Sequence, residues 1–382
     1  MTSESSSSSI SLIKDGFRPP GPDWFSKLFG FAEGTYLETQ RCFKVEGTRL
    51  FSRVTGASWE IGVFNTPSLA ELRAQVRALP EDQTAHLRGA SGSIRVSVLT
   101  GEASALQALP ENRHALFQVA SQFNCLEFVG PRVTPEDGIT AYAFDRTQGP
   151  ACSVGGGAAA AFRNFMVRVK REDGEEHVGQ SMGAMIDNLE KVSALLGNGP
   201  EGRYYKVVGG YTMATDDGLR ELGTALRRVG GAAVKEQLRI GVHSDVQVTS
   251  RDWGTRLLED PDQIITQVLG SACAVSYSRN PWALWAPFAS LVLEASYEAT
   301  LLAAVLNAAK HASKPGSRRV FLTLLGGGVF GNDLQAICKA IQLAIEALSH
   351  FALDVRIVCY REIDPEVLDL LSELGPLAVK QQ

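Results

Sequence analysis

Strand-like and helix-like patterns alternate along most of the 382 residues, and this alternation predicts an α/β fold. Strand-like runs such as residues 320–325 are mostly apolar and lack polar alternation, which indicates a sheet covered on both faces. The helix-like runs repeat apolar residues at spacings of three and four. We therefore expect a three-layer sandwich with a mixed, mostly parallel central sheet over residues 89–382, preceded by an N-terminal extension.

The extension is expected to have two parts. Residues 1–10 are rich in serine and predict a disordered tail, and residues 11–88 predict an accessory unit. The run "RLFSRVTGASWEIGVF" is typical of two strands joined near Thr55 and Gly56. The run "NTPSLAELRAQVRALP" predicts a helix with Thr66 as its cap and Pro67 in its first turn.

The main domain is expected to contain at least six strands and four long helices. The strands are predicted at 93–99, 114–120, 238–248, 267–277, 318–325 and 353–360, and the helices at 183–198, 215–230, 288–311 and 332–350. The run "VFLTLL" (320–325) is expected to be a central strand because it carries no polar side chain except one threonine.

The composition argues against several classes of function. The net charge of −5 and the pI of about 5.8 argue against binding to a nucleic-acid backbone. Six cysteines occur singly without a C-x-x-C pair, which favours reduced thiols and makes zinc improbable on spacing. No uncharged apolar run reaches the length of a membrane span, and no signal sequence is evident. We expect a cytoplasmic protein without a metal, cofactor, membrane or nucleic-acid partner.

The stretch "TLLGGGVFGND", Thr323–Asp333, joins a buried strand to an amphipathic helix. Asn332 is expected to cap this helix, and Asp333 to favour the positive end of its dipole. Unpaired backbone N–H groups at such a helix start can bind an anion. The loop lacks the Gly-Lys-Ser/Thr of a Walker loop and does not open a first strand as a Rossmann loop does. A tight strand–helix turn is the alternative interpretation.

A second glycine run, Gly155, Gly156 and Gly157, precedes four alanines. Two glycine-rich loops ahead of helices could hold a diphosphate from both sides. The alternatives are a flexible surface loop and close helix packing.

Together these motifs resemble the macrodomain, the fold that binds ADP-ribose. The resemblance rests on "VSVLTGEASAL", "LFQVASQFNCLE", "IGVHSDV" and, most specifically, a tyrosine-bearing helix followed by "RRVFLTLLGGGVFGN". The combination of "QFNCLE", "TQGP", "YEATL" and "LLGGGVFGN" is similar to MavL-like ADP-ribosylhydrolases. This resemblance implies an enzyme that removes ADP-ribose from a modified protein, such as ubiquitin, or from an arginine linkage.

The resemblance also implies a set of ligand contacts. Glu102 replaces the aspartate that contacts adenine in the family, Asn124 corresponds to an asparagine near the distal ribose, and Phe330 would pack against that ribose. The expected ligand-binding residues are Glu102, Asn124, Gly155, Gly156, Gly157, Gly326, Gly327, Gly328, Val329, Phe330, Gly331 and Asn332.

Hydrolysis would need a carboxylate that activates water. Asp333, Glu298 and Asp245 are the predicted catalytic residues, and Asp145, Glu294 and His243 are further candidates. Each has a structural alternative: a helix-dipole partner, a solvated helix position or a hydrogen-bonded core residue. Three functional hypotheses therefore remain. The first two are an ADP-ribosylhydrolase and a module that reads ADP-ribose without hydrolysing it; the third, weaker one is a pocket for another nucleotide.

Overall fold

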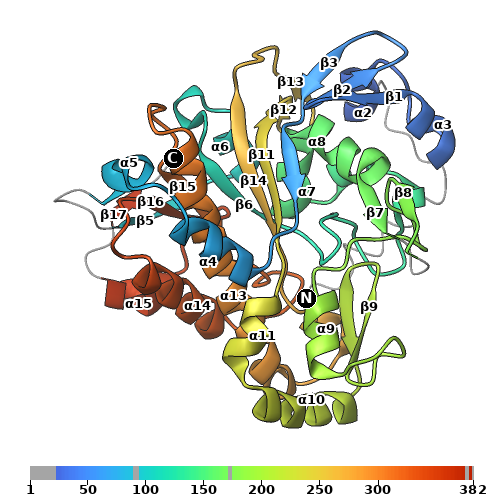
Figure 1. Ribbon diagram of the computed structural model, residues 1–382. Helices are drawn as coiled ribbons and strands as arrows, with labels where there is room; N and C mark the ends of the chain where they lie inside the picture. Colours follow the sequence, from blue (N-terminus) through green and yellow to red (C-terminus); the bar gives the residue numbers. More distant parts are fainter. Residues whose placement is uncertain (1–22, 89–93, 171–173, 375–377, 381–382) are drawn as a thin grey trace.

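The protein is described by a computed structural model that covers residues 23–88, 94–170, 174–374 and 378–380. The tail predicted at residues 1–10 lies outside these ranges. The centre of the molecule is an eight-stranded sheet in the order β17-β5-β16-β15-β6-β14-β11-β4 (Figure 1). Its strands are β4 (Val63–Asn65), β5 (Arg95–Thr100), β6 (Leu116–Ala120), β11 (Gly241–Gln247), β14 (Ile264–Gly270), β15 (Arg319–Thr323), β16 (Asp354–Cys359) and β17 (Ala378–Lys380).

The six strands from β17 to β14 are parallel, whereas β11 and β4 are antiparallel to their neighbours. The predicted mixed, mostly parallel sheet is thus confirmed. β15 pairs with β16 on one side and β6 on the other, so "VFLTLL" does supply a central strand. The predicted strand at 267–277 ends at Gly270, and residues 275–278 form a short helix instead.

Both faces of the sheet are buried, which explains why central strands such as β15 and β6 are mostly apolar. In β6, Leu116 belongs to the core beneath α13 (Trp282–Lys310) and α14 (Leu334–Ala347). The next residue, Phe117, belongs to a second core, shared with α6 (Ala103–Gln107) and α8 (Gly157–Ala161), and stacks on Phe321 of β15. The predicted three-layer sandwich is therefore confirmed, with α7 (Gln148–Gly155) in the second helical layer.

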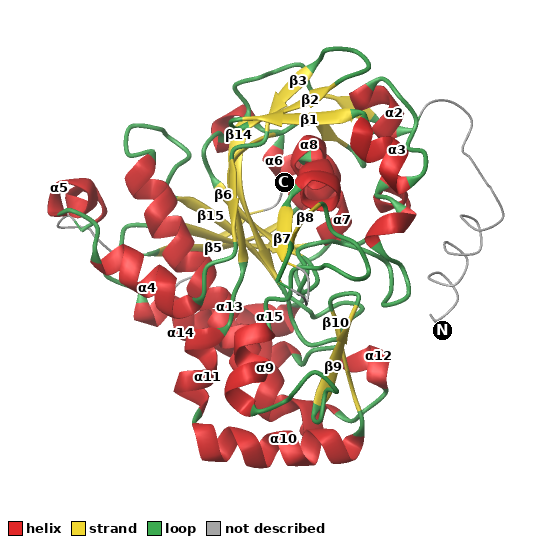
Figure 2. Cartoon of the chain, turned by 45° about the vertical axis from the view of Figure 1, so that its right-hand side comes forward, coloured by secondary structure: helices red, strands yellow, loops and turns green. Residues whose placement is uncertain are grey.

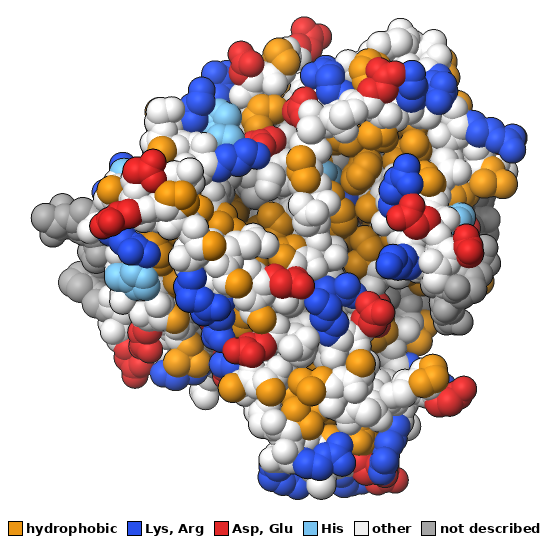
Figure 3. Space-filling model, viewed as in Figure 1, with side chains coloured by type: hydrophobic (Ala, Val, Ile, Leu, Met, Phe, Trp, Pro, Cys, Tyr) orange, Lys and Arg blue, Asp and Glu red, His pale blue; other side chains and the backbone are white. Residues whose placement is uncertain are grey.

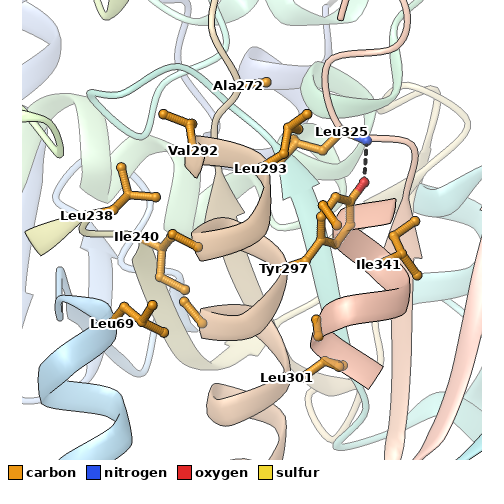
Figure 4. Packing of buried hydrophobic residues seen from close by; sticks show 14 of the residues in the cluster. Leu69, Leu238, Ile240, Ala272, Val292, Leu293, Tyr297, Leu301, Leu325 and Ile341 are labelled. Carbon is orange, nitrogen blue, oxygen red and sulfur yellow. Dashed lines mark hydrogen bonds between the residues drawn. The ribbon is translucent and has the colours of Figure 1, made fainter. Parts of the chain in front are cut away.

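Helix α13 runs through the middle of the first helical layer. Its apolar residues are spread around the whole helix, as expected for a helix packed on all sides. Among the described helices, α13 alone has the length and apolar character that could cross a membrane. However, 72% of its most apolar 18-residue stretch is buried inside the protein, where the helix packs against α4 and α14 (Figure 4).

The N-terminal segment contains α2 (Trp24–Phe29), α3 (Tyr36–Arg41), a small sheet of β1 (Phe43–Glu46), β2 (Arg49–Ser52) and β3 (Ser58–Glu60), then β4 and α4 (Leu69–Arg77). Helix α4 is capped by Ser68, in a capping box with Glu71, and not by Thr66 as predicted. The cap shifts because the serine hydroxyl accepts the N–H of Glu71. β4 extends the main sheet at β11.

A second group of elements lies at the opposite end of the molecule from β1–β3 (Figure 2). It comprises α9 (Glu190–Leu196), β9 (Tyr205–Val208), β10 (Tyr211–Ala214), α10 (Asp216–Val229) and α11 (Gly231–Gln237). The remaining α-helices and strands are α5 (Glu81–Thr84), β7 (Arg168–Lys170), β8 (Glu176–Val178), β12 (Ser250–Arg251), β13 (Arg256–Leu257), α12 (Val275–Ser278) and α15 (Pro365–Leu371). Acidic and basic side chains are interspersed over the face shown in Figure 3.

Candidate functional site

The glycine loop leaves the carboxyl end of β15 and leads into α14. Gly327, Gly328 and Val329 at its tip are exposed. Gly331 has a φ of +69°, and a Cβ atom there would lie 2.0 Å from Ser276 Oγ. A side chain at Gly331 is therefore excluded, whereas a Cβ atom at Gly328 would meet no atom within 4 Å. Glycine is thus required at the base of the loop, and the tip is open to a ligand.

Backbone donors at this tip are free. The N–H groups of Gly328, Val329 and Phe330 donate to no acceptor in the described ranges of the chain. Their neighbours are paired: Gly327 N–H donates to Leu324 O, and Gly331 N–H donates to Gly328 O. Successive free N–H groups in a concave loop can bind an anion without any positively charged side chain.

The base of the loop is held from below by α13. The Tyr297 hydroxyl donates to Thr323 O at 2.7 Å and accepts from Leu325 N–H at 2.8 Å. Figure 4 shows the ring of Tyr297 directed from α13 toward Leu325. Because Tyr297 is fully buried, this pair of hydrogen bonds fixes where the strand ends and the loop begins.

Asn332 and Asp333 close the loop in roles that differ from the predicted ones. Asp333, not Asn332, caps α14, because its carboxylate accepts the N–H of Ala336 at 3.0 Å. Asn332 is buried, and its side-chain amide donates to Cys273 O at 2.8 Å. Asn332 is therefore a structural residue, and Asp333 is a helix cap at the rim of the loop.

Phe330 belongs to an aromatic group beside the loop, and its ring centroid lies 5.3 Å from that of Tyr211 and 5.7 Å from that of Tyr277. Burial and, in addition, the nearby charge of Asp145 raise the pKa of both tyrosines. The charge of Asp145 therefore reaches this aromatic group, and Asp145 itself is partly exposed. Among the carboxylates weighed from the sequence, Asp145 is the one whose charge acts on the two tyrosines that contact Phe330.

The start of α7, in the "TQGP" motif, lies at the same edge of the sheet. Gln148 Oε1 accepts the N–H of Ala103, which follows β5, and Gly149 packs on Ala120 O at the end of β6. Gln148 Nε2 is buried without a hydrogen-bond partner in the described structure. Because β16 and β15 lie between β5 and β6, the start of α7 and the glycine loop share one edge.

Glu102 and Asn124 lie at this edge but already have internal partners. Glu102 caps α6 by accepting the N–H groups of Ser104 and Ala105. Asn124 is fully buried, where its oxygen accepts Leu126 N–H and its amide donates to Gly209 O. Asn124 therefore shapes the turn after β6, and Glu102 keeps a partly exposed carboxylate at the end of β5.

The structure does not bring Gly155, Gly156 and Gly157 to the loop. They form the junction between α7 and α8, and all three are buried. A Cβ atom at Gly155 would meet Gln107, and one at Gly157 would meet Trp24 and Leu28. These glycines allow close packing against the sheet and α2, so the predicted phosphate contact is wrong.

Glu298 also lies away from the loop. Its carboxylate forms two hydrogen bonds with the Arg73 guanidinium, at 2.7 and 2.9 Å, and so joins α13 to α4. Tyr297, the preceding residue, points to the loop from another face of the same helix. Glu294 is likewise paired, with Lys235. The predicted catalytic role of Glu298 is therefore wrong on geometric grounds.

Asp245 lies at the opposite end of the sheet from the loop, beside the last residue of α13. Burial alone would raise the pKa of Asp245, but hydrogen bonds from His311 and Lys310 outweigh it and lower the pKa to about 2. A carboxylate this acidic and this distant cannot be the general base for a ligand at the glycine loop. His243 is a buried core residue, and burial and Arg163 hold its pKa well below its ordinary value.

A buried ion pair beneath this edge was not predicted from the sequence. Glu127 and Arg163 are both fully buried, and Arg163 Nη2 lies 3.7 Å from Glu127 Oε1. Arg163 also donates to Cys125 O and Ser153 Oγ. The only sequence signals were a glutamate and an arginine inside apolar runs. Tyr211 and Tyr277 were missed for a different reason: they are distant in sequence from the loop and meet it only in the fold.

No family model and no curated protein matches the chain. Among solved structures, a poly(ADP-ribose) glycohydrolase from Thermomonospora curvata is similar, with 13% identity, a TM-score of 0.42, and coverage of 88% of this chain and 97% of that one. A poly(ADP-ribose) glycohydrolase from Deinococcus radiodurans in complex with ADP-ribose has 14% identity, a TM-score of 0.39, and coverage of 81% and 92%. At these TM-scores and identities, the similarity assigns no activity to this chain.

Proposed function

We propose that the protein binds ADP-ribose at the glycine loop and removes it from a modified protein. The observation that carries this proposal is the exposed tip of the loop, where the N–H groups of Gly328, Val329 and Phe330 are free at the carboxyl edge of a central strand. Such a tip suits a diphosphate. The resemblance of the loop motifs to macrodomains supports ADP-ribose as the nucleotide.

The second side of the diphosphate site would be the start of α7, in place of Gly155–Gly157. Gln148 Nε2 offers an unused buried donor there. The distal ribose would lie against Phe330, in the aromatic group whose tyrosines are within reach of the charge of Asp145. Asp145 is our candidate for the carboxylate that activates water at the ribose carbon.

The substrate is proposed to be an ADP-ribosylated protein, and the MavL-like motifs favour ubiquitin or an arginine linkage. The alternative is a reader that binds ADP-ribose without hydrolysis. Both use the same loop, so binding alone does not separate them. Only the hydrolase depends on a carboxylate beside the ribose.

The experiment measures two quantities on the full chain: ADP-ribose affinity by calorimetry, and release of ADP-ribose from ADP-ribosylated ubiquitin and from an arginine-modified protein. Gly328→Val should fold normally, because the position is open, and should weaken binding at least tenfold by blocking the phosphate. Gly183→Val is the matched control, since Gly183 also has open space and lies outside the site.

Asp145→Asn keeps an oxygen that can accept the Thr147 N–H and should slow release about 100-fold or more with little change in affinity. Equal affinity in wild type and Gly328→Val would remove the proposed ligand site. Tight binding without release from either substrate would leave the reader in place of the hydrolase.

A further inference from the structure

A second cluster of polar side chains lies at the other end of the sheet, remote from the glycine loop. His114 precedes β6, Asp245 lies in the bulge of β11, and His311 follows α13. One ligand atom from each side chain lies within 4.8 Å of the others. We propose that these three residues form a binding site for a divalent transition-metal ion.

The donor atoms need only small shifts to hold an ion. His311 Nε2 and Asp245 Oδ1 are already 2.8 Å apart, and the two imidazole rings face each other with centroids 4.7 Å apart. Ligands on one tetrahedral zinc ion lie roughly 3.3 Å from each other, given metal–nitrogen bonds of about 2.0 Å. Rotation of the His114 ring toward the other two side chains, with a slight separation of His311 from Asp245, would close the difference.

One donor in the cluster is unused. His114 Nδ1 is buried and has no hydrogen-bond partner among the described residues. A buried imidazole nitrogen without a partner loses the hydrogen bonds that water would provide. An ion coordinated through Nδ1 would satisfy this nitrogen directly.

The backbone holds two of the three ligands in a conformation that side chains rarely adopt. His114 has a φ of 63° and Asp245 a φ of 61°. The first is fixed from both sides, because His114 N–H donates to Ile264 O and its carbonyl accepts the Asn307 side-chain amide at 2.9 Å. The chain thus maintains local strain at two residues whose side chains converge.

The ligand types indicate the class of metal. Two imidazoles and one carboxylate suit zinc or ferrous iron, and they disfavour magnesium and calcium, which prefer oxygen ligands. Three protein ligands leave at least one coordination position for water. A cavity of about 550 Å³ borders the cluster, and its lining includes Ser244, Asn307 and Lys310.

Lys310 is the competitor for this site. Its ammonium group bonds to Asp245 Oδ2, but the side chain is 53% exposed and can swing into water. A divalent ion at Asp245 would displace this ammonium group, because two cations would then share one carboxylate. Spacing in the sequence could not reveal the cluster, since its ligands come from three distant segments.

The test titrates the full-length protein with Zn²⁺ by calorimetry and with Co²⁺ by visible absorption. We expect one ion per chain and a ligand-field band typical of low coordination number. His114→Ala, Asp245→Ala and His311→Ala should each weaken Zn²⁺ binding at least tenfold. His350→Ala removes an exposed histidine elsewhere and should leave binding unchanged.

Lys310→Met should have the opposite effect on affinity, because loss of the competing ammonium group should tighten Zn²⁺ binding several-fold. Circular dichroism of each variant separates loss of the site from loss of the fold. The proposal is overturned if the wild type binds no ion at micromolar Zn²⁺, or if folded ligand variants bind as tightly as the wild type. In that case the cluster is only an ion pair between Asp245, Lys310 and His311.

Discussion

The buried carboxyl group of Glu127, near the start of α7, has an altered pKa. Glu127 is fully buried, and both of its carboxylate oxygens lack a hydrogen bond of good geometry within the described chain. Burial raises its pKa to about 7, although the Arg163 guanidinium opposes this shift. The folded protein therefore holds a proton on Glu127 more tightly than the unfolded chain does.

The sign of the resulting pH dependence follows from this preference. Between the ordinary value of 4.5 and about 7, the folded state binds more protons at Glu127 than the unfolded state, so its contribution to stability falls as pH rises. We expect Glu127→Gln to remove a slope of at most about 1.4 kcal/mol per pH unit. Urea unfolding of both proteins at pH 5 and pH 7 measures it. A difference in stability that does not change with pH would contradict the assignment.

At the scale of elements, the order of strands and helices could be predicted, whereas the contacts between their ends could not. The apolar run at 320–325 predicted a central strand because a sheet buried on both faces needs such a run. The cap of α14 is Asp333, one residue later than predicted, because the side chain of Asn332 is buried and donates a hydrogen bond to Cys273 O. Gly155–Gly157 were misassigned because close packing and ligand approach select the same residue type.

The anchor between α13 and the glycine loop is the element contact most open to test. Tyr297→Phe removes the hydroxyl that joins Thr323 O and Leu325 N–H, at a cost of about 1–3 kcal/mol in stability. Since the loop base loses its anchor, ADP-ribose affinity should fall as well. Tyr205→Phe is the matched control: this buried tyrosine bonds Ser193 of α9, so it should lose stability without losing affinity. Unchanged affinity in Tyr297→Phe would show that the loop holds its shape without the hydroxyl.

On the scale of the whole molecule, residues 11–88 were predicted to be an accessory unit, and their described part shares a core with the rest of the chain. Trp24, Phe25 and Phe29 of α2 form one buried cluster with Ala158 of α8 and with Phe165. Polar contacts also connect the N-terminal segment to the rest of the chain. Glu33, for instance, accepts the backbone N–H groups of Ile139 and Thr140. The sequence could not show this, because each half of the cluster already looks like a plausible core by itself.

The predicted domain boundary at residue 88 can therefore be tested by shortening the chain to residues 89–382. We expect the shortened chain to lose cooperative unfolding, for two reasons. The edge of β11 would lose β4, leaving unpaired backbone groups open to another chain. The buried faces of α8 and α13 would lose α2 and α4, and Glu298 would lose Arg73. Thermal unfolding followed by circular dichroism, with light scattering for aggregation, measures the outcome. A sharp transition at the temperature of the full chain would instead establish residues 89–382 as an independent domain.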